Sequence, residues 1–89
     1  MTDRSVLDQR QRICQIGRRL YDRGLISAAE GNISARLSDG TFLCTPTSLS
    51  KGFLVPEQVA RINANGNLLE GPLQPTSEYR MHLAIYQAQ

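Results

Sequence analysis

Apolar and polar positions divide the chain into one long helical pattern, short extended runs and a second helical pattern. From Ser5 to Arg23, apolar residues recur at roughly helical spacing with arginines between them, which predicts an amphipathic helix that Gly24 ends. Two short apolar runs follow, Ile33–Leu37 and Thr41–Cys44. The turn residues Ser38–Gly40 between them predict an antiparallel hairpin.

The middle of the chain predicts two more strands. Val59–Ile62 and Asn67–Leu69 are short and partly apolar, and Asn63–Gly66 between them favours a turn. Pro56 can begin a helical turn just before them. The order of helix, antiparallel strands and helix predicts one domain over residues 1–89, with an α+β fold in three layers (α/β/α) and a mainly antiparallel central sheet.

The last helix is predicted to run from Glu78 to about Ala88. Thr76 and Ser77 stand directly before it, where a hydroxyl can cap the free N–H groups of the first turn. Met81 and Ile85 lie four residues apart and predict an apolar face of this helix. A Ser/Thr cap before an acidic residue is also how ordinary helices begin, so this stretch alone leaves both a structural and a ligand-binding interpretation open.

Three loops carry small residues, hydroxyls or amides that suit a phosphate group. Their candidate phosphate-binding residues are Gly31 and Asn32, Thr47 and Ser48, and Thr76 and Ser77. Each loop taken singly is also compatible with a plain turn, a polar connection or an ordinary helix start. If the loops meet at one sheet edge, a bound phosphate would hold a small substrate beside Glu78, a layout suited to proton abstraction next to a carbonyl.

Net charge and composition limit the kinds of molecule that this chain is expected to bind. Ten basic and eight acidic residues give a net charge of +2, and no set of aromatic residues accompanies the arginines, so we expect no nucleic-acid partner. No apolar run approaches the length of a membrane span or a signal peptide, so we expect no membrane association and a cytoplasmic location. The basic residues of the first helix are mixed with acidic ones and predict a solvated face: Arg10, Arg12, Arg18, Arg19 and Arg23, with Asp8 and Asp22.

Metal-ligand chemistry is sparse in this sequence. Cys14 and Cys44 have no CxxC or Cys/His partners and are expected to be buried thiols. His82 is the only histidine and follows Glu78 by four residues, on the same helix face. Because a zinc site takes three or four ligands, we expect His82 to pack or to hydrogen-bond.

Three motifs in the same order resemble the class II aldolase/adducin family, and most of all its fuculose-phosphate aldolase-like members. They are Ala29–Ser34, which contains the family-like GNIS, then Thr45–Gly52, and last Pro75–Glu78 with Met81–Tyr86. Their order and spacing match along nearly the whole chain. The resemblance therefore covers the N-terminal portion of such a domain.

The resemblance implies a zinc-dependent aldehyde-lyase that cleaves a phosphorylated ketose to dihydroxyacetone phosphate and an aldehyde. The six loop residues named above match the family's phosphate-binding positions, and Glu78 matches its acid/base. A glutamate at this position favours an aldolase over a 4-epimerase of the family, which typically has aspartate there. The resemblance also implies a cyclic homotetramer.

The family's zinc ligands are a His-x-His pair and a later histidine, and all three would lie beyond Gln89. The resemblance thus implies that the chain lacks the metal ligands and the closing strands of the sheet, and that it is inactive alone. Two alternatives stay open. One is a sugar-phosphate 4-epimerase or a sugar-acid phosphate decarboxylase of the same family, and the other is a non-catalytic adducin-like or truncated remnant.

Overall fold

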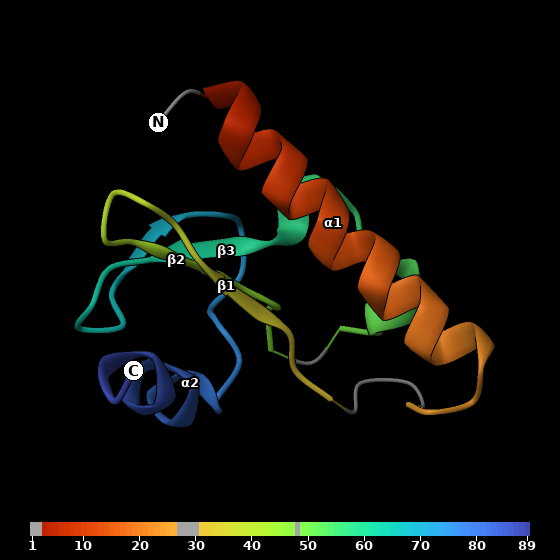
Figure 1. Ribbon diagram of the computed structural model, residues 1–89. Helices are drawn as coiled ribbons and strands as arrows, with labels where there is room; N and C mark the ends of the chain where they lie inside the picture. The colour runs from red at the N-terminus through yellow and green to blue at the C-terminus, as the bar shows by residue number, and fades with distance from the viewer. Residues whose placement is uncertain (1–2, 27–30, 48) are drawn as a thin grey trace.

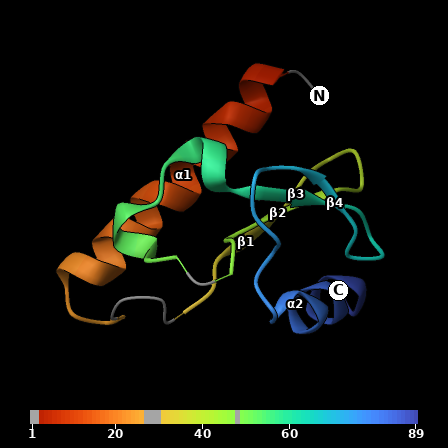
Figure 2. The same ribbon diagram turned by 180° about the vertical axis from the view of Figure 1, so that it is seen from behind.

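The computed structural model describes residues 3–26, 31–47 and 49–89, and these form three layers. A sheet lies in the middle, with helix α1 (Asp3–Asp22) on one side and helix α2 (Tyr79–Gln87) on the other, as the two views of the ribbon show (Figure 1, Figure 2). The predicted three-layer α+β architecture is confirmed. The C-terminal end of the chain lies in α2, beside the sheet.

The central sheet consists of four short strands in the order β1-β2-β3-β4 among the described residues, each antiparallel to its neighbour. All four predicted strands are present; the first three are shorter than their predicted runs, and the fourth is shifted by one residue. Two single turns of 3-10 helix, η1 and η2, separate the two halves of the sheet, and η2 begins at Pro56 as expected. The bounds are β1 (Ser34–Arg36), β2 (Phe42–Cys44), η1 (Lys51–Phe53), η2 (Pro56–Gln58), β3 (Ala60–Ile62) and β4 (Leu68–Glu70).

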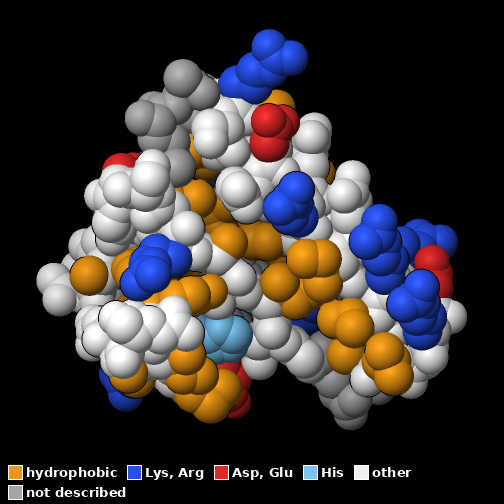
Figure 3. Space-filling view, viewed as in Figure 1, with side chains coloured by type: hydrophobic (Ala, Val, Ile, Leu, Met, Phe, Trp, Pro, Cys, Tyr) orange, Lys and Arg blue, Asp and Glu red, His pale blue; other side chains and the backbone are white. Residues whose placement is uncertain are grey.

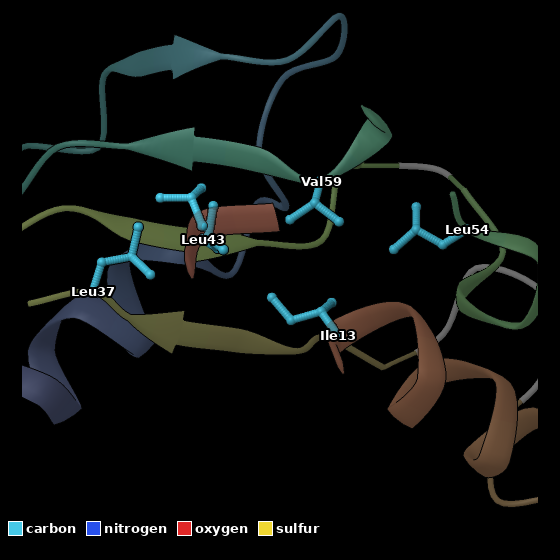
Figure 4. Packing of buried hydrophobic residues seen from close by; sticks show 6 residues of the cluster. Ile13, Leu37, Leu43, Leu54 and Val59 are labelled. Atoms are coloured by element: carbon cyan, nitrogen blue, oxygen red, sulfur yellow. The ribbon is translucent and has the colours of Figure 1, made fainter. Parts of the chain in front are cut away.

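Alternation along β2 divides the core into two. Successive side chains of a strand point to opposite faces, so Leu43 points to the α1 side while Phe42 and Cys44 point to the α2 side. Leu43 is fully buried in the first cluster, which Figure 4 shows in close view. The first cluster contains Val6, Ile13, Leu37, Leu43, Leu54 and Val59, and the second contains Phe42, Cys44, Ala60, Ile62 and Leu83.

Helix α1 is amphipathic as predicted, but one of its arginines does not belong to a solvated face. The Arg10 guanidinium donates to the Val59 carbonyl and lies 3.5 Å from the Glu70 carboxylate, and its side chain is only 12% exposed. Arg18 instead forms an exposed ion pair with Asp22 at 3.1 Å. In Figure 3 several basic side chains lie together with an acidic one at the right, over the second half of α1, while other basic side chains lie singly on this face. None of the helices in the described ranges is long and apolar enough to cross a membrane.

The hydroxyl-rich segment Thr45–Gly52, which follows β2, ends in two buried residues. Its Lys51 and Gly52 pack against α1, because Gly17 on that helix has no side chain to keep them away. A Cβ at Gly17 would lie 2.3 Å from the Lys51 carbonyl oxygen. This burial lowers the pKa of the Lys51 ammonium. The sequence did not predict η1 because its contact with α1 depends on one distant glycine.

The two residues predicted to form the apolar face of α2 do not pack into the core. Met81 and Ile85 are each about half exposed, at 53% and 52%, while Leu83 is buried in the second cluster. Tyr79 and Tyr86 pack against the same cluster. The helix therefore turns its two tyrosines and Leu83 toward the sheet, since the rings cover more area than Met81 and Ile85 would.

Gly66 in the β3–β4 turn lies against Tyr79, the first residue of α2, and we expect that a side chain at this position would destabilise the protein. It has φ +87°, and a Cβ there would lie 2.2 Å from the ring of Tyr79. Gly40 has nearly the same backbone, with φ +86°, but a Cβ there meets nothing within 4 Å. Both Gly→Ala changes carry backbone strain, and Gly66→Ala adds the clash. We expect Gly66→Ala to lower the free energy of unfolding by about 1–3 kcal/mol more than Gly40→Ala.

Urea denaturation of the two variants beside the unchanged protein measures this difference. Equal losses would mean that Tyr79 moves aside at no cost and that the Gly66 contact does not position α2.

Candidate functional site

The three candidate loops meet at one end of the sheet. Ser34 of β1 pairs with Cys44 of β2, so the segment that leads into β1 and the segment that leaves β2 lie at the same end. An antiparallel bridge between Pro46 and Pro75 brings the start of α2 to this point. Residues far apart in the sequence are thus collected around one edge.

Backbone hydrogen bonds hold these three segments together. The Thr45 N–H donates to the Ile33 carbonyl at 3.0 Å, and the Thr45 carbonyl accepts from the Thr76 N–H at 2.9 Å. The Thr47 N–H donates to the Gln74 carbonyl at 3.0 Å. Thr45 and Thr76 are both buried. The loops therefore have fixed places relative to one another before any ligand binds.

Side-chain contacts then connect Asn32, Thr76 and Glu78. The Thr76 hydroxyl donates to the Asn32 side-chain carbonyl, and it accepts a hydrogen bond from the Glu78 N–H at 3.3 Å. The predicted hydroxyl cap is wrong, because α2 has no side-chain cap. Thr76 instead satisfies the N–H of Glu78, which itself holds the N-cap position of α2, and Ser77 is exposed.

The other candidate residues lie around this group. Gly31 precedes Asn32 with φ +78°, a conformation that a side chain would strain. Thr47, Ser77 and Glu78 are exposed to solvent. Ser48 lies outside the described residues. The structure brings Asn32, Thr76 and Glu78 into one hydrogen-bonded group, and the roles of all seven candidates as phosphate ligands or acid/base stay predictions.

His82 hydrogen-bonds to the sheet, in agreement with the interpretation favoured above. Its Nδ1 lies 2.6 Å from the Ser34 hydroxyl, which also lies 2.9 Å from the Tyr86 hydroxyl. The sequence analysis gave neither Ser34 nor Tyr86 a role of its own, although each ends one of the family-like motifs. The sequence feature that could have identified this contact is the four-residue spacing of His82 and Tyr86, which places both polar groups on one helix face.

The residues that the structure describes do not form a metal site. No three side chains among its histidines, cysteines, aspartates and glutamates come together to hold an ion. The Nδ1 atom of His82 already faces Ser34. The described residues therefore do not fit the zinc that the family resemblance implies, and we derive no chemical step through it.

Both cysteines are free thiols, but only Cys44 is buried as expected. Cys44 is buried beneath the loops, and this burial raises the pKa of its thiol to about 11, against a smaller opposing effect of a backbone hydrogen bond from Thr76. Cys14 is half-buried, and burial together with the charge of Glu57 raises its pKa as well. Neither thiol is a ready nucleophile at neutral pH.

Comparison with known proteins identifies the class of domain. Residues 11–89 match the family described as Class II Aldolase and Adducin N-terminal domain. The chain therefore belongs to this family. It superposes on the crystal structure of YgbL from Escherichia coli with a TM-score of 0.88 and 31% identity, over 93% of this chain and 40% of YgbL.

Two named activities occur among the curated relatives that the chain resembles. An L-fuculose phosphate aldolase from Methanococcus maripaludis is 47% identical over 77 residues, which is 85% of this chain and 39% of that protein. A 3-oxo-tetronate 4-phosphate decarboxylase from Haemophilus influenzae is 42% identical over 86 residues, which is 97% of this chain and 39% of that protein. The chain thus spans about two fifths of the length of these relatives.

Replacement of Thr76 tests the hydrogen bond between its hydroxyl and the Glu78 N–H just before α2. We expect Thr76→Val to lower the free energy of unfolding by about 1 kcal/mol, because it removes the hydroxyl that accepts from the Glu78 N–H. Thr76→Ser keeps the hydroxyl and should restore most of the loss. Ser77→Ala is the matched control, since Ser77 is exposed and should change stability little.

Urea denaturation measures the stability of these variants, and hydrogen exchange at the Glu78 amide locates the change. If Thr76→Val were as stable as Thr76→Ser, the hydroxyl would have no part in starting the helix.

Proposed function

We propose that this chain supplies the phosphate-binding loops and the proton-transferring carboxylate of a class II aldolase. The substrate would be a phosphorylated ketose, cleaved to dihydroxyacetone phosphate and an aldehyde. Membership of the family and the presence of lyases among the relatives support this class of reaction. A zinc cofactor, a homotetramer and a cytoplasmic location remain predictions that accompany the proposal.

One observation carries the proposal, namely the hydrogen-bonded group of Asn32, Thr76 and Glu78. An amide and hydroxyls beside backbone N–H groups are suitable donors to a phosphate monoester. Glu78 follows Thr76 by two residues and is exposed, so a ligand held by the loops would lie near the residue that carries the carboxylate. Such positioning is the main contribution that a scaffold makes to proton transfer.

Retro-aldol cleavage needs a proton at one carbon atom. The carbon–carbon bond breaks as the hydroxyl of the departing portion transfers its proton to water and becomes the aldehyde carbonyl. The bonding electrons remain on the phosphorylated ketone fragment as an enediolate. Glu78 in its protonated form would give a proton to that carbon, and as a carboxylate it would remove the same proton in the direction of synthesis.

A second candidate is decarboxylation of a 3-oxo sugar-acid phosphate. The similarity to the Haemophilus influenzae decarboxylase, over 97% of this chain, favours it specifically. Loss of carbon dioxide also leaves an electron pair beside a carbonyl, and a proton must then reach that carbon. The same loops and the same carboxylate would serve both reactions, so product analysis distinguishes the two.

Phosphate binding can be tested on the chain itself. We expect titration of ¹⁵N-labelled protein with dihydroxyacetone phosphate, and with inorganic phosphate, to shift the amide resonances of Asn32, Thr47 and Glu78. Asn32→Ala should weaken the affinity about tenfold or more, the usual effect of removing a hydrogen bond to a charged group. Asn67→Ala, at an exposed asparagine of the β3–β4 turn, is the matched control.

Dihydroxyacetone without phosphate should leave these resonances in place. If it shifts the same amides, or if Asn67→Ala weakens binding as much as Asn32→Ala, the loops are not a phosphate site.

The role of Glu78 requires a comparison of turnover with binding. In a longer protein that carries this chain together with the zinc ligands implied by the family resemblance, we expect Glu78→Gln to reduce turnover of a phosphorylated ketose by about 10²–10⁴-fold while the affinity for inorganic phosphate stays nearly constant. The amide keeps the shape of the side chain and removes its ability to exchange a proton. Glu57→Gln, an exposed glutamate of η2, should leave both quantities unchanged. An equal loss of turnover and phosphate affinity would contradict the acid/base role.

A further inference from the structure

Ser34 connects the sheet to two side chains of α2 at once. Its hydroxyl lies 2.6 Å from Nδ1 of His82 and 2.9 Å from the hydroxyl of Tyr86. His82 and Tyr86 are four residues apart and lie one turn above the other on the helix. A single serine of β1 therefore contacts two successive turns of α2.

The hydrogen-bonding capacity of the three groups forms a continuous chain. A serine hydroxyl has one proton to donate and lone pairs that accept, and so has a tyrosine hydroxyl. When Nδ1 of His82 accepts from Ser34, Tyr86 can donate to Ser34, and Nδ1 and both hydroxyls then have partners. All three residues are partly buried, where such bonds are stronger than in water.

A second residue of the same strand face supports this attachment. Arg36 lies two positions after Ser34, so both side chains project from β1 toward α2. The Arg36 guanidinium donates to the Tyr86 carbonyl oxygen at 3.2 Å and lies 5.6 Å from the centre of the Tyr86 ring. Polar contacts with one face of β1 thus fix the second half of α2.

The segment from Asn32 to Ser34 also contacts the chain just before α2. Asn32 contacts Thr76 before α2, and Ser34, two residues further on, contacts His82 within α2. Glu78 lies between these two attachments. Its N–H donates to the Thr76 hydroxyl, and its carbonyl accepts from the His82 N–H at 3.3 Å.

We propose that Ser34, His82 and Tyr86 are positioning residues, whose hydrogen-bonded chain sets the orientation of α2 and thereby the place of Glu78 relative to the phosphate loops. This proposal rests on the function proposed above for Glu78 and the loops. The three residues act through the helix, and none of them needs to touch the substrate.

Ser34→Ala is the direct test, with Ser38→Ala in the exposed hairpin turn as the matched control. Residual dipolar couplings of the backbone amides measure the orientation of α2 relative to the sheet. We expect Ser34→Ala to change the couplings of α2 and to leave those of β2 and β3 as they are. The ¹⁵N resonance of His82 Nδ1 should move at the same time, because that atom loses its partner. Ser38→Ala should change neither.

Titration with inorganic phosphate separates positioning from a general loss of stability. In Ser34→Ala we expect the amides of Asn32 and Thr47 to respond with unchanged affinity, while the response of the Glu78 amide is reduced at least twofold. Partial unfolding would reduce all three responses together. Ser34→Thr keeps the hydroxyl and should restore the Glu78 response. Tyr86→Phe removes one oxygen only and should give a smaller change in the same direction.

The outcomes separate this proposal from the function on which it rests. If α2 keeps its orientation in Ser34→Ala and in Tyr86→Phe, the positioning role is wrong, whether or not phosphate binds. If phosphate shifts no loop amide in the unchanged protein, the proposed function is wrong, and the dipolar couplings alone then decide whether Ser34 orients the helix.

Discussion

The arrangement of the candidate site depends on the hydrogen bonds of one buried residue, Thr45. Its N–H donates to the Ile33 carbonyl, its carbonyl accepts from the Thr76 N–H, and its hydroxyl accepts from the Ile33 N–H at 3.3 Å. The segments before β1 and before α2 are both attached to this one residue. Since Thr45 is fully buried, each of these bonds would leave an unsatisfied polar group if it broke.

The two-sided sheet explains why such a short chain can hold these segments in place. Leu43 packs toward α1 while Phe42 and Cys44 pack toward α2, so β2 is buried on both faces. The end of β2 is therefore a rigid base for the residues that follow it. Helix α2 has only nine residues and would be marginal alone, and it depends on Leu83 and on contacts with β1 for its place.

Periodicity in the sequence was sufficient for the layers and for the four strands, because alternation and turn residues are local signals. It was insufficient for α2. Met81 and Ile85 have the spacing of one helix face, but that face is exposed and is not the one that packs on the sheet. Which face is buried depends on the fit of Tyr79 against Gly66 and of Tyr86 against Phe42 and Ser34, and these contacts join distant parts of the chain. The same reason applies to Arg10, whose partners Val59 and Glu70 are far along the sequence.

The grouping of Asn32, Thr76 and Glu78 was predicted from the chemistry of the loops, whereas the contact between Asn32 and Thr76 was not. That contact has a consequence for ligand binding. The Thr76 hydroxyl has one proton and gives it to the Asn32 carbonyl, so a phosphate that takes this proton must break the bond. Rotation of the Asn32 amide would then turn its NH₂ group toward the anion. Binding would thus exchange one internal hydrogen bond for two to the phosphate, and the Thr76 oxygen could still accept from the Glu78 N–H throughout.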